Sequence, residues 1–233
     1  MIIVESLTKK YNGIEALTNL HLKIEEGEIY GMLGANGAGK TTTINILLGL
    51  IKPDSGTAKI NGLDCYNKRR ELTKYIGYIP ENVQLYNYLS GLENLKYFSQ
   101  LARLKYSNDE LENILMSCGL PKQFINKRLD VYSKGMIQKV GIAIALAKNA
   151  KVLLLDEPSS GLDPKAANEL SEILISLSKN GITIFMASHD IFRTRETCNR
   201  IGILKQGSLL KEILASDVSS NELEKIYINF MHG

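Results

Sequence analysis

A glycine-rich loop at residues 34–42 reads Gly-Ala-Asn-Gly-Ala-Gly-Lys-Thr-Thr and matches the phosphate-loop pattern G-x-x-x-x-G-K-[ST]. The apolar residues 28–33 before it are predicted to form a strand, and residues 43–48 after it a helix. Glycines let the backbone approach a polyphosphate closely, and the N–H groups then form an anion site at the positive end of the helix dipole. The order strand, loop, helix therefore predicts an α/β fold built around a phosphate site.

Each residue of this loop is a candidate for phosphate binding. Lys40 is expected to reach the β- and γ-phosphates, and the Thr41 hydroxyl is expected to ligate Mg²⁺. A plain glycine-rich turn before a helix is the alternative, but such a turn does not require the Lys-Thr pair. The predicted nucleotide-binding residues are Gly34, Ala35, Asn36, Gly37, Ala38, Gly39, Lys40, Thr41 and Thr42.

Size and charge restrict the class of protein only modestly. The chain has 233 residues, 44% of them hydrophobic, which suits one large domain with a substantial core. The net charge of +3 gives no strong field for nucleic acid or a membrane surface, so we expect no nucleic-acid partner. The basic run at residues 68–70 is interpreted as a solvated face, with phosphate or lipid contact as the alternative.

The cysteines and the apolar runs indicate where the chain works. Cys65, Cys118 and Cys198 form no C-x-x-C pair, so neither a disulfide framework nor a zinc site is predicted, and reduced thiols in a cytosol fit best. The N-terminus lacks a signal-peptide layout, and no apolar run approaches the roughly 20 residues of a membrane span. If the protein works at a membrane, we expect another chain to supply the membrane part.

Three zones follow one another along the chain. Residues 1–33 carry short alternating segments separated by turns at 12–13 and 26–27, which predicts antiparallel strands, and 57–60 adds another. Residues 84–148 are helical by pattern, with Ser90 as a helix cap and Glu93 three residues on. From residue 151 strands and helices alternate, which predicts a mostly parallel sheet, and residues 221–230 are expected to form a closing amphipathic helix. We expect one folding unit, with a core of residues 1–83 and 149–233 and an inserted helical part at 84–148.

Two carboxylates end a continuous apolar run, in the sequence Val152-Leu-Leu-Leu-Asp156-Glu157. Such a run predicts a buried parallel strand, and ligands bind at the carboxyl edge of open α/β sheets. Adjacent strand residues point in opposite directions, so the two acids should have different roles. Asp156 is expected to hold Mg²⁺, and Glu157 to orient or deprotonate an attacking water. An acidic pair that caps the next helix is the alternative.

Residues 131–138, Val-Tyr-Ser-Lys-Gly-Met-Ile-Gln, open a predicted helix and resemble the signature loop of the ATP-binding cassette (ABC) family, usually Leu-Ser-Gly-Gly-Gln. With this loop the resemblance covers the whole chain in the family's order. Tyr11 matches the aromatic residue that stacks on adenine, and Glu81 matches the Q-loop. Ser160 and Asp163 match the D-loop, and His189 matches the switch histidine. The signature positions are Ser133, Lys134, Gly135 and Met136.

The resemblance implies a phosphate-loop NTPase fold: a mostly parallel RecA-like sheet, an N-terminal antiparallel β-subdomain and an inserted helical subdomain. It also implies a head-to-tail dimer, in which Ser133 and Gly135 of one cassette close on the ATP held by the other. Lys40, Glu157 and His189 would then be the catalytic residues, with ATP and Mg²⁺ bound. A plain helix cap by Ser133 is the alternative for the signature loop, and a cover over a strand edge is the alternative for Tyr11.

The chain departs from the family pattern at three positions. Lys134 replaces the first signature glycine and Met136 replaces glutamine, but Ser133 and Gly135 are kept, so we expect activity. Glu81 replaces the Q-loop glutamine. A carboxylate cannot donate an amide hydrogen bond but can ligate Mg²⁺, so Glu81 is a candidate metal ligand together with Thr41 and Asp156.

By resemblance the chain is expected to be the ATPase subunit of an ABC transporter, similar to bacterial drug or peptide export cassettes. It would act as a homodimer or heterodimer of cassettes, in the cytoplasm and peripheral on the inner face of the cell membrane through a separate transmembrane permease. Residues 83–90, with Tyr86 and Tyr88, would dock that permease or would simply be subdomain core. The alternatives are a non-transport ABC ATPase of the DNA-repair or translation type, and a nucleotide-binding regulator with little turnover. The transported substrate is not recorded in this sequence.

Overall fold

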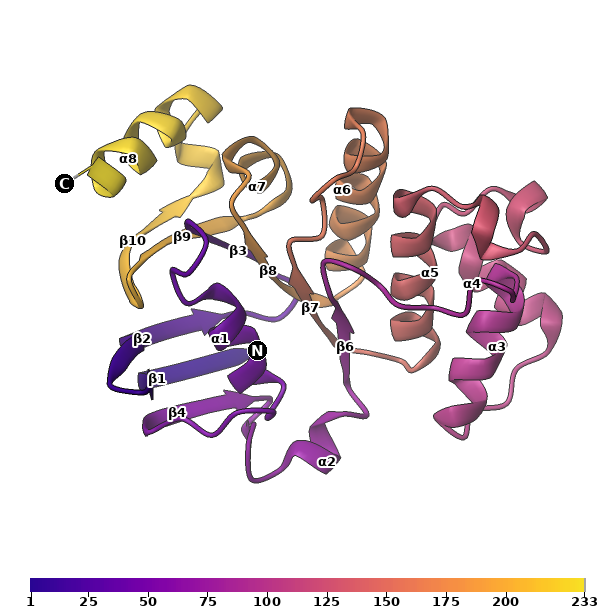
Figure 1. The fold of residues 1–233 in the computed structure, drawn as a ribbon, viewed down its shortest axis with the longest axis horizontal. Coiled ribbons are helices and arrows are strands. Elements are labelled where there is room, and N and C mark those ends of the chain that lie inside the picture. The colour runs from indigo at the N-terminus through magenta and orange to yellow at the C-terminus, as the bar shows by residue number, and fades with distance from the viewer. Residues whose placement is uncertain (233) are drawn as a thin grey trace.

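A computed structural model describes residues 1–232 of the chain (Figure 1), and a six-stranded sheet runs through its middle in the order β10-β9-β3-β8-β7-β6. The five strands from β9 to β6 are parallel, and β10 pairs antiparallel with β9 at one edge. This confirms the predicted mostly parallel sheet. The strands are β3 (Ile29–Leu33), β6 (Ile76–Ile79), β7 (Val152–Asp156), β8 (Thr183–Ser188), β9 (Arg200–Lys205) and β10 (Ser208–Leu214).

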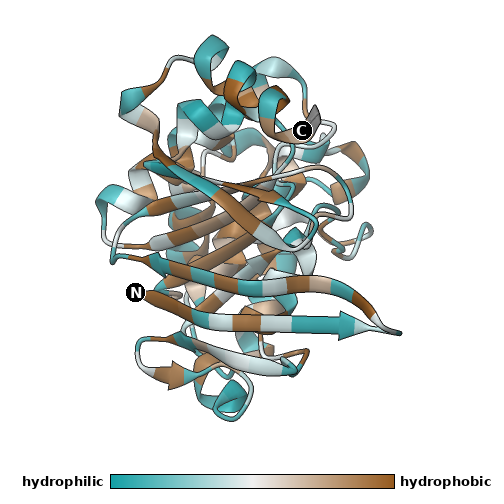
Figure 2. Ribbon diagram, turned by 90° about the vertical axis from the view of Figure 1, so that its left-hand side faces the viewer, coloured by the Kyte–Doolittle hydropathy of each residue, from teal (hydrophilic) through white to brown (hydrophobic). Residues whose placement is uncertain are grey.

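The central strands β3, β7 and β8 are mostly apolar because both of their faces are buried, and their polar residues Asp156, Thr183 and Ser188 lie at strand ends. In β7, Leu153 and Leu155 belong to one hydrophobic cluster, whereas Val152 and Leu154 belong to a second cluster on the other face of the sheet. Figure 2 shows the hydrophobic colour concentrated on these central strands, while the surrounding helices alternate between polar and apolar. Burial on both faces fixes the carboxyl ends of the strands rigidly, and the candidate site lies at those ends.

A second sheet is antiparallel, in the order β2-β1-β4-β5, and it confirms the antiparallel strands predicted before residue 25 and at residues 57–60. The prediction was wrong for the segment that begins at residue 28, because β3 is buried at every position and pairs parallel with β8 and β9 in the central sheet. The hairpin between its first two strands turns at Asn12 and Gly13, whose φ angles of 49° and 83° match the Asn-Gly turn that hairpins favour. Its strands are β1 (Ile2–Tyr11), β2 (Ile14–Ile24), β4 (Ser55–Ile60) and β5 (Leu63–Asp64).

The helices form two groups. α3, α4 and α5 lie together beyond β6, to the right in Figure 1, while the others flank the two sheets. Ser90 and Glu93 form the predicted capping box at the start of α3. No helix within residues 1–232 is long and apolar enough to cross a membrane. The helices are α1 (Lys40–Leu47), α2 (Arg69–Leu72), α3 (Gly91–Leu101), α4 (Asn108–Ser117), α5 (Lys134–Ala147), α6 (Pro164–Lys179), α7 (Ile191–Thr197) and α8 (Ser220–His232).

Five of the helices and strands were not predicted from the sequence: β5, α2, β6, α7 and β10. The strand β6 is short and contains Gly77, which local patterns score against a strand. The glycine is explained by packing, because a Cβ at position 77 would lie 2.4 Å from the Cβ of Ala145 on α5. The strand β10 lies at the sheet edge, so most of its side chains are exposed and it carries no strong apolar pattern. The division at residues 84 and 148 stays a prediction.

An ion pair joins the helical group to the core of the molecule. Nζ of the buried Lys139 on α5 lies 2.6 Å from Oε2 of Glu169 on α6, and it also donates to the carbonyl oxygen of Gly119 at 3.0 Å. This hydrogen bond from Lys139 is the main cause that lowers the pKa of Glu169. The bond therefore stabilises the fold above the ordinary pKa of a glutamate and ceases to do so as the pH falls through the lowered pKa.

We expect Lys139→Ala to lower the free energy of unfolding by about 2 kcal/mol at neutral pH, because two hydrogen bonds from a buried ammonium group are lost. Lys165→Ala is the matched control: Lys165 faces the same Glu169 at 4.0 Å from an exposed position, and its loss should cost less than about 0.5 kcal/mol. Denaturant unfolding of both variants tests this. The difference between Lys139→Ala and the wild type should shrink on acidification, and equal losses for the two variants would contradict the assignment.

Candidate functional site

The phosphate loop connects the buried strand β3 to the first turn of α1. Gly39 precedes the helix with φ 112°, and Gly37 has φ 80°, so both adopt backbone conformations that favour glycine. A Cβ at Gly39 would lie 2.5 Å from the carbonyl oxygen of Ala16. The loop therefore needs glycine at position 39 for close packing as well as for backbone geometry. It presents the amino end of α1 to solvent, as an anion site requires.

A polar cavity of about 400 Å³ opens beside this loop. It brings together residues that lie far apart in the sequence and that were predicted to bind the nucleotide or the metal. Tyr11, by contrast, lies at the end of β1, is 42% exposed and does not line the cavity, so its stacking on adenine stays a prediction. The lining residues are Ala16, Ala35, Asn36, Gly37, Gly39, Lys40, Thr41, Thr42, Glu81, Asp156 and Glu157.

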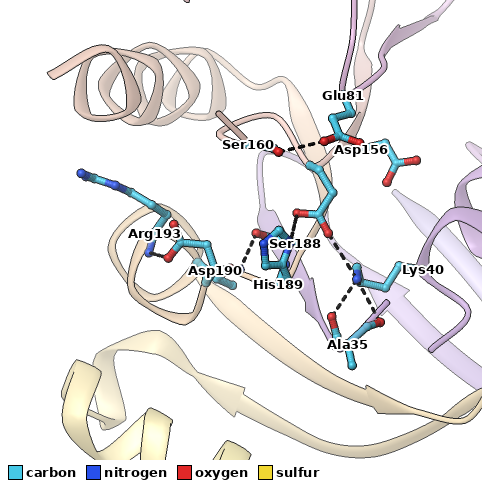
Figure 3. Close-up of polar contacts among 12 residues, drawn as sticks. Ala35, Lys40, Glu81, Asp156, Ser160, Ser188, His189, Asp190 and Arg193 are labelled. Carbon is cyan, nitrogen blue, oxygen red and sulfur yellow. Dashed lines mark hydrogen bonds and ion pairs between the residues drawn. The ribbon is translucent and has the colours of Figure 1, made fainter. Parts of the chain in front are cut away.

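Lys40 lies in the floor of this cavity, and only 5% of its surface is exposed. Its ammonium group donates to the carbonyl oxygens of Gly34 at 2.7 Å and Ala35 at 3.2 Å, and it lies 3.2 Å from Oε1 of Glu157 (Figure 3). Its positive charge is thus held in the loop by neutral carbonyls and one carboxylate. A bound triphosphate would compete for the same ammonium group.

Asp156 ends β7, next to the first turn of α1. The hydroxyl of Thr41 donates to Oδ2 of Asp156 at 3.0 Å. Burial is the main cause that raises the pKa of Asp156, and the hydrogen bond from Thr41 opposes it. A hydroxyl and a partly buried carboxylate are hard oxygen ligands, and Mg²⁺ is commonly bound by one or two carboxylates together with substrate phosphates. Thr41 and Asp156 therefore fit the predicted magnesium site, although no cluster of three or more His, Cys, Asp or Glu side chains within residues 1–232 forms a metal cage.

Glu157 and His189 form a hydrogen-bonded pair at the same sheet edge. Oε2 of Glu157 lies 2.8 Å from Nδ1 of His189 and accepts from the backbone N–H of His189 at 3.2 Å. Glu157 has φ 47°, a left-handed conformation that is uncommon for residues other than glycine. Its backbone N–H donates to the carbonyl of Ala187 at 2.9 Å, which anchors this turn to β8. Backbone strain of this kind clusters at functional sites. The expectation that Asp156 and Glu157 point in opposite directions as adjacent strand residues is wrong, because β7 ends at Asp156, Glu157 adopts a left-handed conformation, and both residues line the same cavity.

Glu81 follows β6 and lines the same cavity, on the side away from Lys40 (Figure 3). Its Oε1 accepts a hydrogen bond from the hydroxyl of Ser160 at 2.8 Å (Figure 3). Its backbone carbonyl accepts one from Nε2 of Gln138 on α5 at 3.2 Å. The structure thus joins the predicted Q-loop residue to the predicted D-loop serine within one chain. A metal contact by Glu81 stays a prediction.

The signature residues lie away from this cavity. The Ser133 hydroxyl accepts from the backbone N–H of Met136 at 3.3 Å and so caps α5, as the alternative for this loop predicted. The Ser133 side chain is exposed and Gly135 is buried, and neither lines the cavity that holds Lys40. The predicted contact of Ser133 and Gly135 with the ATP held by a second cassette stays a prediction. Asp163, the second D-loop residue, caps α6 by accepting from the backbone N–H groups of Lys165 and Ala166.

Sequence reasoning gave no role to two residues at the site. Ala16 lines the cavity from β2, and no local pattern marks it. Gln138 lies on the buried face of α5, where it is 2% exposed and bonds to the Glu81 backbone. A polar side chain within the apolar run of a predicted helix was the available signal, because buried polar groups are almost always hydrogen-bonded.

Sequence comparison assigns the chain to one family. The model for "ABC transporter" matches residues 17–160. The bacitracin transport ATP-binding protein BcrA of Bacillus licheniformis is 38% identical over 214 residues, covering 91% of this chain and 69% of BcrA. An uncharacterized ABC transporter ATP-binding protein of Synechocystis is also 38% identical, over 213 residues, covering 90% of this chain and 59% of that protein. This chain is therefore shorter than both of these relatives.

Solved structures give the same result for the fold. The ATP-binding cassette MJ0796, as a dimer in a post-hydrolysis state with ADP and Pi bound, matches with a TM-score of 0.80 and 32% identity, over 92% of this chain and 99% of that one. The protein cbiO1 of Clostridium perfringens, part of the ABC transporter complex cbiONQ, matches with a TM-score of 0.86 and 29% identity, over 98% and 94%. These matches confirm the predicted phosphate-loop NTPase fold.

Proposed function

The chain belongs to the ABC transporter family, and from this we propose that it is the ATP-binding and hydrolysing subunit of a transporter whose membrane part is a separate permease. One observation carries the proposal: the phosphate loop, the Thr41–Asp156 pair and Glu157 line one polar cavity, and the Glu157 carboxylate is hydrogen-bonded to His189 just outside that lining. These are the parts that hydrolysis of a phosphoanhydride needs: an anion site, a metal site and a base.

The contacts of Lys40 and Glu157 suggest how the chain's own residues act. ATP bound in the loop would draw the Lys40 ammonium toward its phosphates and away from the Glu157 carboxylate, which lies 3.2 Å from it in this structure. Glu157 is then available to accept a proton from the attacking water, while His189 holds its other oxygen. Mg²⁺, held by Thr41 and Asp156, would supply charge neutralisation on the phosphate oxygens.

The position of the signature loop favours a dimer. Ser133 and Gly135 do not line the cavity of their own chain, yet they lie at the amino end of α5, where a phosphate would be favourable. The related cassette MJ0796 is dimeric with ADP and Pi bound. We therefore propose that two cassettes, identical or different, pair head to tail and that each completes the other's ATP site.

An exposed aromatic patch next to a groove is the proposed docking surface for the permease. Tyr86, Tyr88 and Tyr97 are 37%, 67% and 37% exposed, and the rings of Tyr86 and Tyr97 contact each other edge to face. The groove beside them measures about 610 Å³ and contains two lysines, which suits a partner segment with apolar and acidic side chains. This surface would hold the chain at the inner face of the cell membrane, and an export role rests on the resemblance noted above. The groove is lined by Thr73, Lys74, Phe98, Leu101, Ala102, Leu104, Ile144 and Lys148.

Replacement of Leu101 by glutamate tests the docking surface. Leu101 lines the groove and is 63% exposed, so the change should leave the fold intact while placing a charge on the proposed apolar contact. We expect recovery of a co-expressed candidate permease with the tagged chain to fall at least about tenfold, the loss of one interface hot spot. ATP hydrolysis by the isolated chain should stay unchanged.

Leu214→Glu is the matched control, because Leu214 is 52% exposed but lies on β10, away from the groove. It should recover as much permease as the wild type. If the two variants recover equal amounts of permease, the groove does not dock that partner. If even the wild-type chain recovers none, the transporter assignment fails with it.

A further inference from the structure

Glu81 has two possible partners that lie on different sides of its side chain. Its carboxylate lines the nucleotide cavity together with Thr41 and Asp156, and its Oε1 accepts a hydrogen bond from the Ser160 hydroxyl at 2.8 Å. Its backbone is meanwhile held to α5 by Gln138. The backbone of Glu81 is thus fixed, and the carboxylate is the part that can change partner.

The bond to Ser160 joins two loops at the site. The backbone N–H of Ser160 donates to the carbonyl of Glu157 at 3.1 Å, so Ser160 belongs to the turn that follows the proposed base. The hydroxyl of Ser160 then crosses to the loop after β6. Release of the Glu81 carboxylate would remove this direct link between the two loops.

Electrostatics favours different partners for Glu81 in different states. Without a cation, the carboxylates of Glu81, Asp156 and Glu157 line one cavity and repel one another, and Lys40 compensates only Glu157 directly. Without a cation, the Ser160 hydroxyl, which lies outside the cavity lining, is therefore the favourable partner for the Glu81 carboxylate. A divalent cation in the cavity reverses the preference, because a carboxylate is a good ligand for Mg²⁺. A glutamine at this position would not carry the charge that makes the preference depend on the cation.

We propose that the Glu81 carboxylate is shared between Ser160 and the magnesium–nucleotide complex, so that Ser160 restrains the metal-dependent part of ATP binding. The inference rests on the proposed function and adds a role for Ser160 as a positioning residue that acts through Glu81. ATP binding with Mg²⁺ breaks the Ser160 bond, whereas binding without metal leaves it in place. The turn after Glu157 is thereby released only when both ATP and metal are bound.

The test compares binding of the non-hydrolysable ATP analogue AMP-PNP with Mg²⁺ and with EDTA, by isothermal titration calorimetry. In Ser160→Ala, Mg²⁺ should improve the affinity more than it does in the wild type, by about threefold to tenfold, which corresponds to one hydrogen bond that no longer competes. The affinity in EDTA should match that of the wild type. Ser160→Thr keeps the hydroxyl and should restore the wild-type ratio.

Ser159→Ala is the matched control, because Ser159 lies beside Ser160 in the same turn and is likewise half-buried. It should leave both affinities unchanged. A double-mutant cycle tests the route through Glu81: in a Glu81→Ala background, adding Ser160→Ala should no longer change the ratio.

Two outcomes would overturn the inference. An unchanged ratio in Ser160→Ala would show that the bond does not restrain metal-dependent binding. An equal change with Mg²⁺ and with EDTA would show that Ser160 acts on the nucleotide site as a whole and not through the metal. Failure of the wild-type chain to bind the analogue under either condition would instead refute the proposed function, so the two failures can be told apart.

Discussion

Glu157→Gln is expected to bind ATP and form a dimer while hydrolysing ATP about 10³-fold more slowly than the wild type, within the range of a lost general base. The amide keeps the size of the side chain and can still face His189, which lies 2.8 Å from the carboxylate. It cannot accept the proton of the attacking water. It also removes the negative charge that lies 3.2 Å from the Lys40 ammonium group, so nucleotide affinity should not fall.

Phosphate release measures the loss of turnover, and size-exclusion chromatography with light scattering measures the dimer with and without Mg-ATP. Glu172→Gln is the control, because Glu172 lies on α6, contacts Asn168 and does not line the cavity. It should hydrolyse ATP like the wild type. Wild-type turnover in Glu157→Gln would refute the assignment of Glu157 as the base. A variant that binds ATP but stays monomeric would contradict the proposal that two isolated chains pair through contacts of Ser133 and Gly135 with each other's ATP.

Lys40→Ala is expected to lower the affinity for ATP by about 100-fold, because a charge-assisted hydrogen bond to a phosphate is lost. The ammonium group is already directed into the loop, where it donates to the carbonyls of Gly34 and Ala35. Its removal also leaves the half-buried Glu157 carboxylate without its nearest cation. Equilibrium binding of ATP in EDTA isolates the phosphate contact from any effect of the metal.

Lys165→Ala removes an equal charge from an exposed position on α6 and should bind ATP like the wild type. The two variants therefore separate a specific phosphate contact from a change in net charge. Wild-type affinity in Lys40→Ala would refute the assignment of residues 34–42 as the phosphate site. Equal losses in both variants would indicate that only the overall charge matters.

Local signals in the sequence predicted much of the fold, because each depends on residues close together in the chain. The Asn12-Gly13 turn, the Ser90–Glu93 capping box and the apolar run of β7 are of this kind, and each is present in the structure. The strand β6 was missed because its glycine, Gly77, is required by close packing against Ala145 of α5, a helix that begins only at Lys134. A contact with a distant element leaves no local pattern.

The sequence by itself determined the chemical groups of the site and their order along the chain: the phosphate loop, two carboxylates after a buried strand and a histidine after another. Tertiary structure alone decided which groups meet. Glu157 contacts His189, and Glu81 contacts Ser160 across 79 positions of sequence, because parallel strands in the order β3-β8-β7-β6 end at one edge. Strand order depends on burial of both faces of the sheet, a property of the whole core, and so no short segment encodes these pairings.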